Sequence, residues 1–237
     1  MGVPAPRVAD NGPVTVTTDD LDQDHGPSAE PIEPGGRWRT PLVALVAGMC
    51  LTLGLVAGLL VVPALTRPGD DSVEAGFVRD MSTHHSQAVE MGLTAFGSPS
   101  ASEKIRAIAV DIALGQHGQI GLMSAWLREW HLEPTGSRPP MAWMGEHAGQ
   151  DGGPLMPGMA TADEIARLRA ASGRDQDVLF CQLMLRHHVG GLHMVDAVLA
   201  RTDHSDVRWL AESMRSTQGK EVAMFETLLK EMGAKPI

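Results

Sequence analysis

A short pattern, Met-x-x-His-His-x5-Met, occurs twice in this chain. Its members are Met81, His84, His85 and Met91 in the first copy, and Met184, His187, His188 and Met194 in the second. A second segment follows each copy and also repeats, so that Gln116 aligns with Gln218. The chain therefore contains an internal duplication of a two-segment unit, and its fold must accommodate two similar halves.

The apolar residues of both halves recur with helical spacing. The stripes around the two glutamines follow an i, i+4, i+7 pattern, and strand signals are nearly absent because the chain has no tyrosine and few clusters of β-branched residues. The predicted helices cover residues 74–95, 103–131, 176–201 and 205–232. The sequence thus predicts an all-α bundle made of two similar helix pairs.

Start and stop signals refine these bounds. Ser100 and Glu103 fit a capping box at the start of the second helix, and Thr161 with Glu164 predicts a short helix that ends near Gly173. Gly233 is expected to close the last helix.

The N-terminal part of the chain has a different character. Residues 1–36 are rich in Pro, Gly, Asp and Thr and carry seven acids against one base, a composition typical of a disordered tail. Residues 42–65 contain no charge and are long enough to span a bilayer. A cleaved signal peptide is the alternative, but the preceding tail and the apolar run are too long for one. We expect an uncleaved transmembrane anchor.

The flanks of the anchor predict its orientation and the domain order. Arginines precede the apolar run and acids soon follow it, which favours a single-pass protein of the cell membrane with a cytoplasmic N-terminus and an extracytoplasmic C-terminal domain. The expected regions are a tail (1–36), an anchor (37–67) and a duplicated helical domain (74–233). Within this domain, repeat 1 is 74–131, a Met/Pro/Gly-rich connector is 132–175, and repeat 2 is 176–233.

Charge and cysteine content limit the partners. The net charge of −10 disfavours a nucleic-acid partner. Cys50 lies in the apolar run and Cys181 in the second His-His segment, so a disulfide between them is not expected. The expected partner is the membrane, through residues 42–65; protein partners remain open, and the sequence is compatible with a homo-oligomer.

The repeated histidines are predicted to face the inside of the bundle. On a helix, Phe77, Met81, His84 and Met91 share one face, with His85 at its edge, and the second copy repeats this arrangement. The buried glutamines of the other helices complete a polar layer, which needs partners, water or a metal. Two interpretations follow: a packing layer that only fixes the register of the bundle, or a metal site.

Copper is the metal that these residue types favour. The chain has no Glu-x-x-His motif, which argues against a di-iron carboxylate centre. Imidazole combined with thioether sulfur suits Cu(I) better than iron or zinc. The candidate metal ligands are His84, His85, His187, His188, Met81, Met91, Met184, Met194, Gln116, Gln218 and Glu221.

Other His and Met residues are weaker candidates. Met123 and Met214 are expected to fill the core. The connector could capture copper or form a hydrophobic lid through Met141, Trp143, Met144, His147, Met156 and Met159. His193 and Glu90 are expected to be solvated, and His117, His131 and His204 to lie at the surface.

The segments around residues 80–91 and 180–194, each followed by a helix with the repeated glutamine, resemble the domain of unknown function 305 family. Residues 156–173 of the connector are similar to that family as well. The resemblance implies a ferritin-like four-helix fold, secreted or membrane-anchored, with a functional His pair. It also implies an acid three residues after each glutamine; Glu221 satisfies this, whereas the first repeat has Gln119.

These observations leave three classes of function. The leading hypothesis is an extracytoplasmic copper-binding domain for storage, delivery or tolerance, and the alternative is a non-catalytic interaction module. A metal-dependent redox enzyme is the third, but no nucleophile arrangement or substrate-pocket motif favours it.

Overall fold

The computed structural model describes residues 39–149 and 155–237. These residues form six α-helices and one 3-10 helix, η1 (Ala142–Gly149), and contain no strand. The predicted all-α class is confirmed. The tail predicted to be disordered, residues 1–36, lies outside the described residues, as does the part of the connector at 150–154.

The first helix, α1 (Arg39–Thr66), contains the apolar run seen in the sequence. By length and composition, its segment Pro41–Leu59 is suited to cross a membrane, and no part of that segment is buried in the protein. The boundary between the two compact units of the chain falls inside α1, between Ala57 and Gly58.

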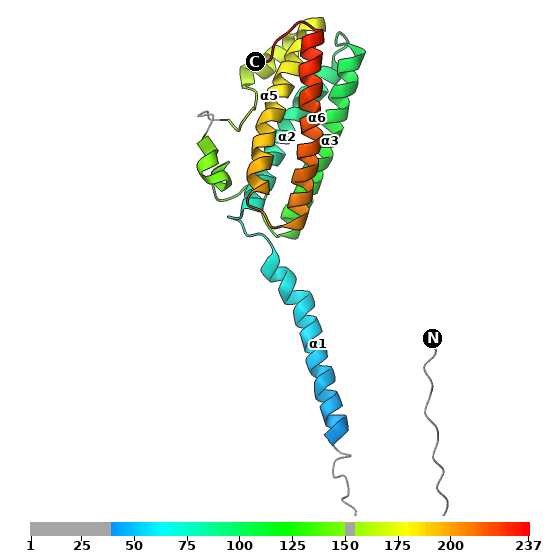
Figure 1. Ribbon diagram of the computed structural model, residues 1–237, viewed down its shortest axis with the longest axis vertical. Coiled ribbons are helices and arrows are strands. Elements are labelled where there is room, and N and C mark those ends of the chain that lie inside the picture. Colours follow the sequence, from blue (N-terminus) through cyan, green and yellow to red (C-terminus); the bar gives the residue numbers. More distant parts are fainter. Residues whose placement is uncertain (1–38, 150–154) are drawn as a thin grey trace, which may run out of the picture. The chain divides into compact units, whose positions relative to one another are not determined.

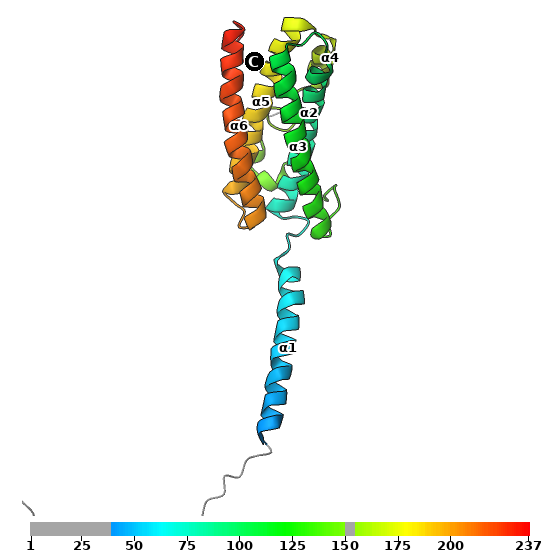
Figure 2. The same ribbon diagram turned by 90° about the vertical axis from the view of Figure 1, so that its right-hand side faces the viewer.

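Four long helices form a bundle (Figures 1 and 2). They are α2 (Val73–Gly97), α3 (Glu103–Glu129), α5 (Gly173–Leu199) and α6 (Ser205–Glu231). Helix α2 packs against α3, α5 packs against α6, and α2 and α5 join the two pairs. The predicted helices therefore exist, with bounds that differ by at most three residues.

The helix ends show which capping predictions hold. The short helix α4 (Ala162–Ala170) begins with the predicted capping box of Thr161 and Glu164. For α3 the prediction was wrong, because the N-cap is Ser102, whose hydroxyl accepts from the backbone N–H of Ile105. Ser100 instead accepts a hydrogen bond from the backbone of Gly173, which explains why it lies near the helix start without capping it.

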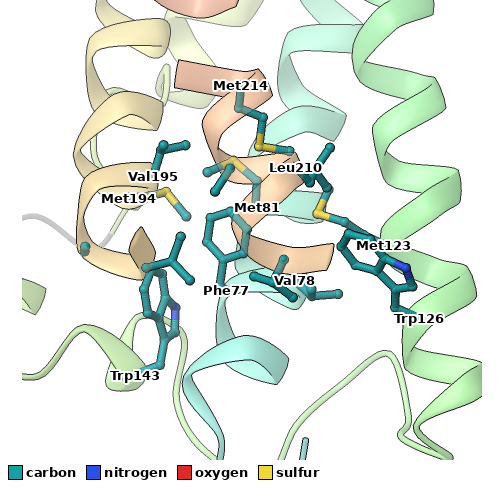
Figure 3. Close-up of a cluster of buried hydrophobic side chains, with 14 of the residues drawn as sticks. Phe77, Val78, Met81, Met123, Trp126, Trp143, Met194, Val195, Leu210 and Met214 are labelled. Atoms are coloured by element: carbon teal, nitrogen blue, oxygen red, sulfur yellow. The ribbon is translucent and has the colours of Figure 1, made fainter. Parts of the chain in front are cut away.

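The core consists of two hydrophobic clusters. The Trp/Met cluster lies around Phe77 and includes the sulfur atoms of Met81, Met123, Met194 and Met214 (Figure 3). The Phe/Met cluster contains Met91, Met184 and the edge-to-face pair Phe180 and Phe225, whose centroids are 6.0 Å apart. Because Met81 shares a cluster with Met194, and Met91 with Met184, the repeated motifs run in opposite directions along α2 and α5.

The start of the connector folds back on the N-terminal half of α2. Asp80, which is buried, accepts hydrogen bonds from the backbone N–H of Met141 and from the indole N–H of Trp143, at 2.6 and 2.8 Å. Met141, Trp143 and Met144 are thereby buried in the Trp/Met cluster. This arrangement agrees with a hydrophobic lid rather than a free loop.

Candidate metal centre

The four histidines of the repeated motif meet in the middle of the bundle. His84 and His187 stack across the α2 and α5 interface, with ring centroids 3.8 Å apart. His85 and His188 flank this stack, 6.4 Å and 6.2 Å from the neighbouring ring on their own helix. None of the four is more than 1% exposed, so the predicted inward orientation is found for all of them, including the two at the edge of the helical face. We call these four rings the histidine layer.

Each ring of the histidine layer has an oxygen atom at its Nε2. His84 contacts the carbonyl of Pro157 at 3.0 Å, and His187 contacts the carbonyl of His84 at 3.0 Å. His85 contacts Gln119 Oε1, and His188 contacts Glu221 Oε2, both at 2.7 Å. Carbonyl and carboxylate oxygens only accept hydrogen bonds, so these partners place the proton of each neutral imidazole on Nε2. The lone pair is left on Nδ1.

Several buried atoms around the histidine layer have no partner among the described residues. They are the Nδ1 atoms of His84, His85 and His188 and the Oε1 atoms of Gln116 and Gln218. All five can accept, and with the protons on Nε2 none of them can donate. A buried group without a partner costs about 1–3 kcal/mol, so the layer favours an occupant that supplies positive charge or protons, such as a metal ion or water. The unpartnered acceptors of the layer are therefore three imidazole nitrogens and two amide oxygens.

Burial keeps three of these imidazoles, those of His84, His85 and His187, neutral. It lowers the pKa of His84 to about 4 and that of His85 to about 3. Burial also places the pKa of His187 well below its usual range, and the neighbouring His84 lowers it further. Neutral imidazole is the form that binds metals, so these three rings have no proton to lose before they ligate at neutral pH.

The helices α3 and α6 close the layer from outside with equivalent side chains. Gln119 and Glu221 occupy the same position in the two repeats, and each accepts from the outer histidine of its half. Metal-binding histidines commonly donate their second N–H to such an oxygen, which fixes the orientation of the ring. The first repeat therefore keeps the geometry of the second although it lacks the acid.

The connector covers the layer on the side of His84. The carbonyl of Pro157 accepts from His84, and the side-chain amide of Gln87 exchanges two hydrogen bonds with the backbone of Ala160. Gly190 lets this segment approach α5, because a Cβ there would clash with the carbonyl of Pro157. One short segment of the connector is thus fixed to both central helices.

The methionines lie in layers on either side of the histidines. Met81 and Met194 belong to the Trp/Met cluster, and Met91 and Met184 to the Phe/Met cluster, so each pair combines one residue from each repeat. All four are fully buried. Within residues 39–149 and 155–237, no three His, Cys, Asp or Glu side chains converge on a common ion position. A metal in this arrangement would need Met or Gln ligands beside imidazole.

The remaining predicted positions divide between surface and core. His117, His131 and His193 are exposed, and Glu90 pairs with Arg169 at the surface. His204 is half-buried rather than fully exposed, because it packs edge-on against Trp130. Met123 and Met214 are fully buried, Met156 and Met159 are partly buried, and the side chain of His147 lies outside the described part of the chain.

Four contacts of this site were missed in the sequence: those of Gln119, Asp80, Gln87 and Pro157. Gln119 could have been found, because it aligns with Glu221 in the second repeat. The others depend on where the connector crosses the bundle, and they have no counterpart in the duplication.

Comparison with known proteins places the chain in a family. Residues 74–229 match the model of the domain of unknown function 305 (DUF305). The chain belongs to this family. Among curated proteins, none matches it.

Solved structures share the fold. A DUF305 protein from Streptomyces coelicolor is 40% identical, with a TM-score of 0.66 over 71% of this chain and 99% of its own. A DUF305 fragment from Deinococcus radiodurans is 30% identical, with a TM-score of 0.56 over 67% and 96%. CopM in its Cu(II)-bound form is 22% identical, with a TM-score of 0.51 over 68% and 97%; at this identity the likeness concerns the fold alone.

Proposed function

We propose that this protein is a membrane-anchored, extracytoplasmic domain that binds a metal ion, most favourably copper, for storage, delivery or tolerance. The observation that carries the proposal is the set of buried lone pairs in the histidine layer. Each Nε2 has an oxygen partner, while the Nδ1 atoms of His84, His85 and His188 have none. This is the arrangement of histidines that ligate through one nitrogen and are oriented through the other.

The surroundings of the layer favour copper over other metals. Thioether sulfur lies on both sides of it, in Met81 and Met194 and in Met91 and Met184. The glutamine oxygens of Gln116 and Gln218 are the other candidate ligands. Imidazole with thioether sulfur suits copper, and Cu(I) above all. Copper-bound forms of CopM, which has the same fold at low identity, are consistent with this choice.

The proposed location rests on α1. The segment Pro41–Leu59 is apolar enough to span a bilayer, and the arginines before it favour a cytoplasmic N-terminus. Residues 1–36 would then form the cytoplasmic tail, 37–67 the anchor, and 74–233 the extracytoplasmic domain with its two repeats. A substituted-cysteine labelling experiment on intact cells, at exposed Ser216 and with Cys50→Ser, should label the bundle from outside. Protection of Ser216→Cys until the cells are lysed would contradict this orientation.

The binding test uses the full chain in detergent micelles, with Cys50→Ser to remove the exposed thiol as a competing ligand. The chain should retain Cu(I) or Ag(I) through gel filtration, and its melting temperature should rise with added ion. Changing all four histidines of the layer to Gln should abolish retention. Absence of binding in the parent, or unchanged binding in the quadruple variant, would contradict the proposal.

Two further variants guard against loss of folding. His117→Gln with His131→Gln changes exposed rings only and should leave binding intact. Met81→Leu with Met194→Leu should weaken Cu(I) binding, whereas Met123→Leu with Met214→Leu, in the same cluster, should not. Met to Leu keeps the volume, so both pairs should fold.

The alternative is a non-catalytic module whose histidine layer only specifies packing. The specific observation in its favour is that all four Nε2 atoms already have oxygen partners within the protein. In that case the quadruple variant would melt at a lower temperature in metal-free buffer, and added ions would not raise the melting temperature of the parent.

A further inference from the structure

Gln119 and Glu221 stand at equivalent positions of the two repeats and make the same contact. Each accepts a hydrogen bond of 2.7 Å from the Nε2 of a buried histidine, His85 in one half and His188 in the other. The two side chains have nearly the same size and shape. The two halves of the histidine layer therefore match in geometry, and they differ in charge, because one partner is an amide and the other a carboxylate.

This difference reaches the opposite nitrogen of each ring. A carboxylate that accepts the N–H of an imidazole makes the other ring nitrogen a stronger ligand, and losing such a partner typically weakens metal binding 10–100-fold. The Nδ1 atoms of His85 and His188 are both buried and without a partner. Glu221 therefore makes Nδ1 of His188 a stronger metal ligand, whereas Gln119 leaves Nδ1 of His85 a weaker one.

The ionic charge of the metal affects its binding energy through Coulomb's law. A negative charge beside the site attracts a divalent ion with twice the energy of a monovalent one at the same distance. The effect grows where water is excluded. His85 and His188 are both 0% exposed, and the Glu221 side chain is 19% exposed. The half with Glu221 thus favours the higher charge, and the half with Gln119 has no such preference.

We propose that this one difference makes the two halves select different charge states of copper, with Cu(II) held in the half of His188 and Cu(I) in the half of His85. The inference rests on the proposed metal binding and adds to it the ionic charge that each half selects. Glu221 and Gln119 act as positioning residues, since both work through a histidine.

The protein supplies its own matched substitutions. Glu221→Gln gives His188 the partner that His85 already has, and Gln119→Glu does the reverse, so neither change should disturb the fold. The double swap, Gln119→Glu with Glu221→Gln, exchanges the two halves. Glu212→Gln makes the same chemical change at an exposed position of α6 and serves as the control. Melting curves in metal-free buffer check that all variants are folded.

Competition with chelators measures the affinities for Cu(II) and Ag(I) on the full chain with Cys50→Ser. Ag(I) serves as a monovalent ion that is not oxidised or reduced. Glu221→Gln should weaken Cu(II) binding 10–100-fold and Ag(I) binding several-fold less. Gln119→Glu should add a second tight Cu(II) equivalent. The double swap should bind like the parent, and Glu212→Gln should change nothing.

Two results would overturn the inference and they are separable. If the parent binds both ions but Glu221→Gln weakens them equally, or not at all, the charge selection is wrong and the proposed metal binding stands. If the parent binds neither ion, both ideas fall together.

Discussion

In the first repeat, the two histidines donate to the connector and to an amide, whereas in the second they donate to a helix carbonyl and to a carboxylate. The geometry of the four rings is nevertheless nearly the same in both halves. The duplication therefore sets where the rings lie, and the partners of the rings are free to differ. Chemical differences between the halves follow from these partners rather than from the histidines.

The connector is the main source of this asymmetry, because the chain has only one. At equivalent helix positions, α2 has Gln87, which holds the connector by hydrogen bonds, and α5 has Gly190, which makes room for it. About two helical turns earlier, α2 has Asp80, which anchors Met141 and Trp143, while α5 has the apolar Leu183. The equivalent helices α2 and α5 thus present different side chains to the single connector.

The largest expected effect is on stability at low pH, and it comes from the buried histidine rings that both halves contain. The folded-state pKa values of His84 and His85 are about 4 and about 3, below the 6.5 of an unfolded histidine. Below pH 6.5 the unfolded chain binds more protons than the folded chain. The free energy of unfolding therefore decreases as the pH is lowered, by about 3 kcal/mol for each of these two rings at pH 4. Urea denaturation of the metal-free protein at pH 7.5, 6, 5 and 4 measures this. His85→Gln should reduce the slope, and equal stability at pH 7.5 and 4 would contradict the burial argument.

The second prediction tests the contact that only the second repeat offers. Gly190→Ala should destabilise the fold by about 3 kcal/mol, because its Cβ would overlap the backbone of Pro157 and Gly158. Gly219→Ala, on α6 with open space around it, should instead stabilise the fold by up to about 1 kcal/mol. Thermal and urea unfolding compare the two. If both variants behave alike, the connector does not press on α5 as described.

The third prediction makes the first repeat resemble the second at the connector anchor. Asp80→Leu places the residue of position 183 at position 80 and leaves the N–H groups of Met141 and Trp143 without their acceptor. The expected loss is about 2 kcal/mol, with Trp143 fluorescence shifting to longer wavelength as the lid loosens. Asp80→Asn keeps one acceptor oxygen and should lose less. A stable variant with unchanged fluorescence would show that Asp80 is dispensable.

Much of the fold could be predicted from the sequence because it follows from local patterns. The i, i+4, i+7 stripes and the duplication predict four helices, an all-α class and the inward face of the histidines. The register of a cap is harder to predict, as Ser100 and Ser102 show. Ser100 would cap a helix that begins at Ala101, whereas Ser102 caps the helix that begins at Glu103, and Ser100 is instead engaged by the backbone of Gly173.

The partners of the histidines could be predicted only in part. Glu221 was expected from its place after the repeated glutamine, and Gln119 at the aligned position makes the same contact. The carbonyl of Pro157 could not be predicted, since any backbone oxygen can accept and the sequence does not say where the connector crosses α2. The half-burial of His204 likewise depends on the packing of Trp130 from another loop.

The stack of His84 on His187 has a consequence for the order of folding. It joins residues 103 positions apart, and His187 also donates to the main chain of α2 at that point. Contacts between such distant residues form late, after the entropy of closing a long loop has been overcome. During synthesis, a chain that has left the ribosome only as far as α4 contains two of the four rings and cannot build the layer. We therefore expect the layer, and any ion that needs both of its halves, to assemble only after α5 has packed against α2.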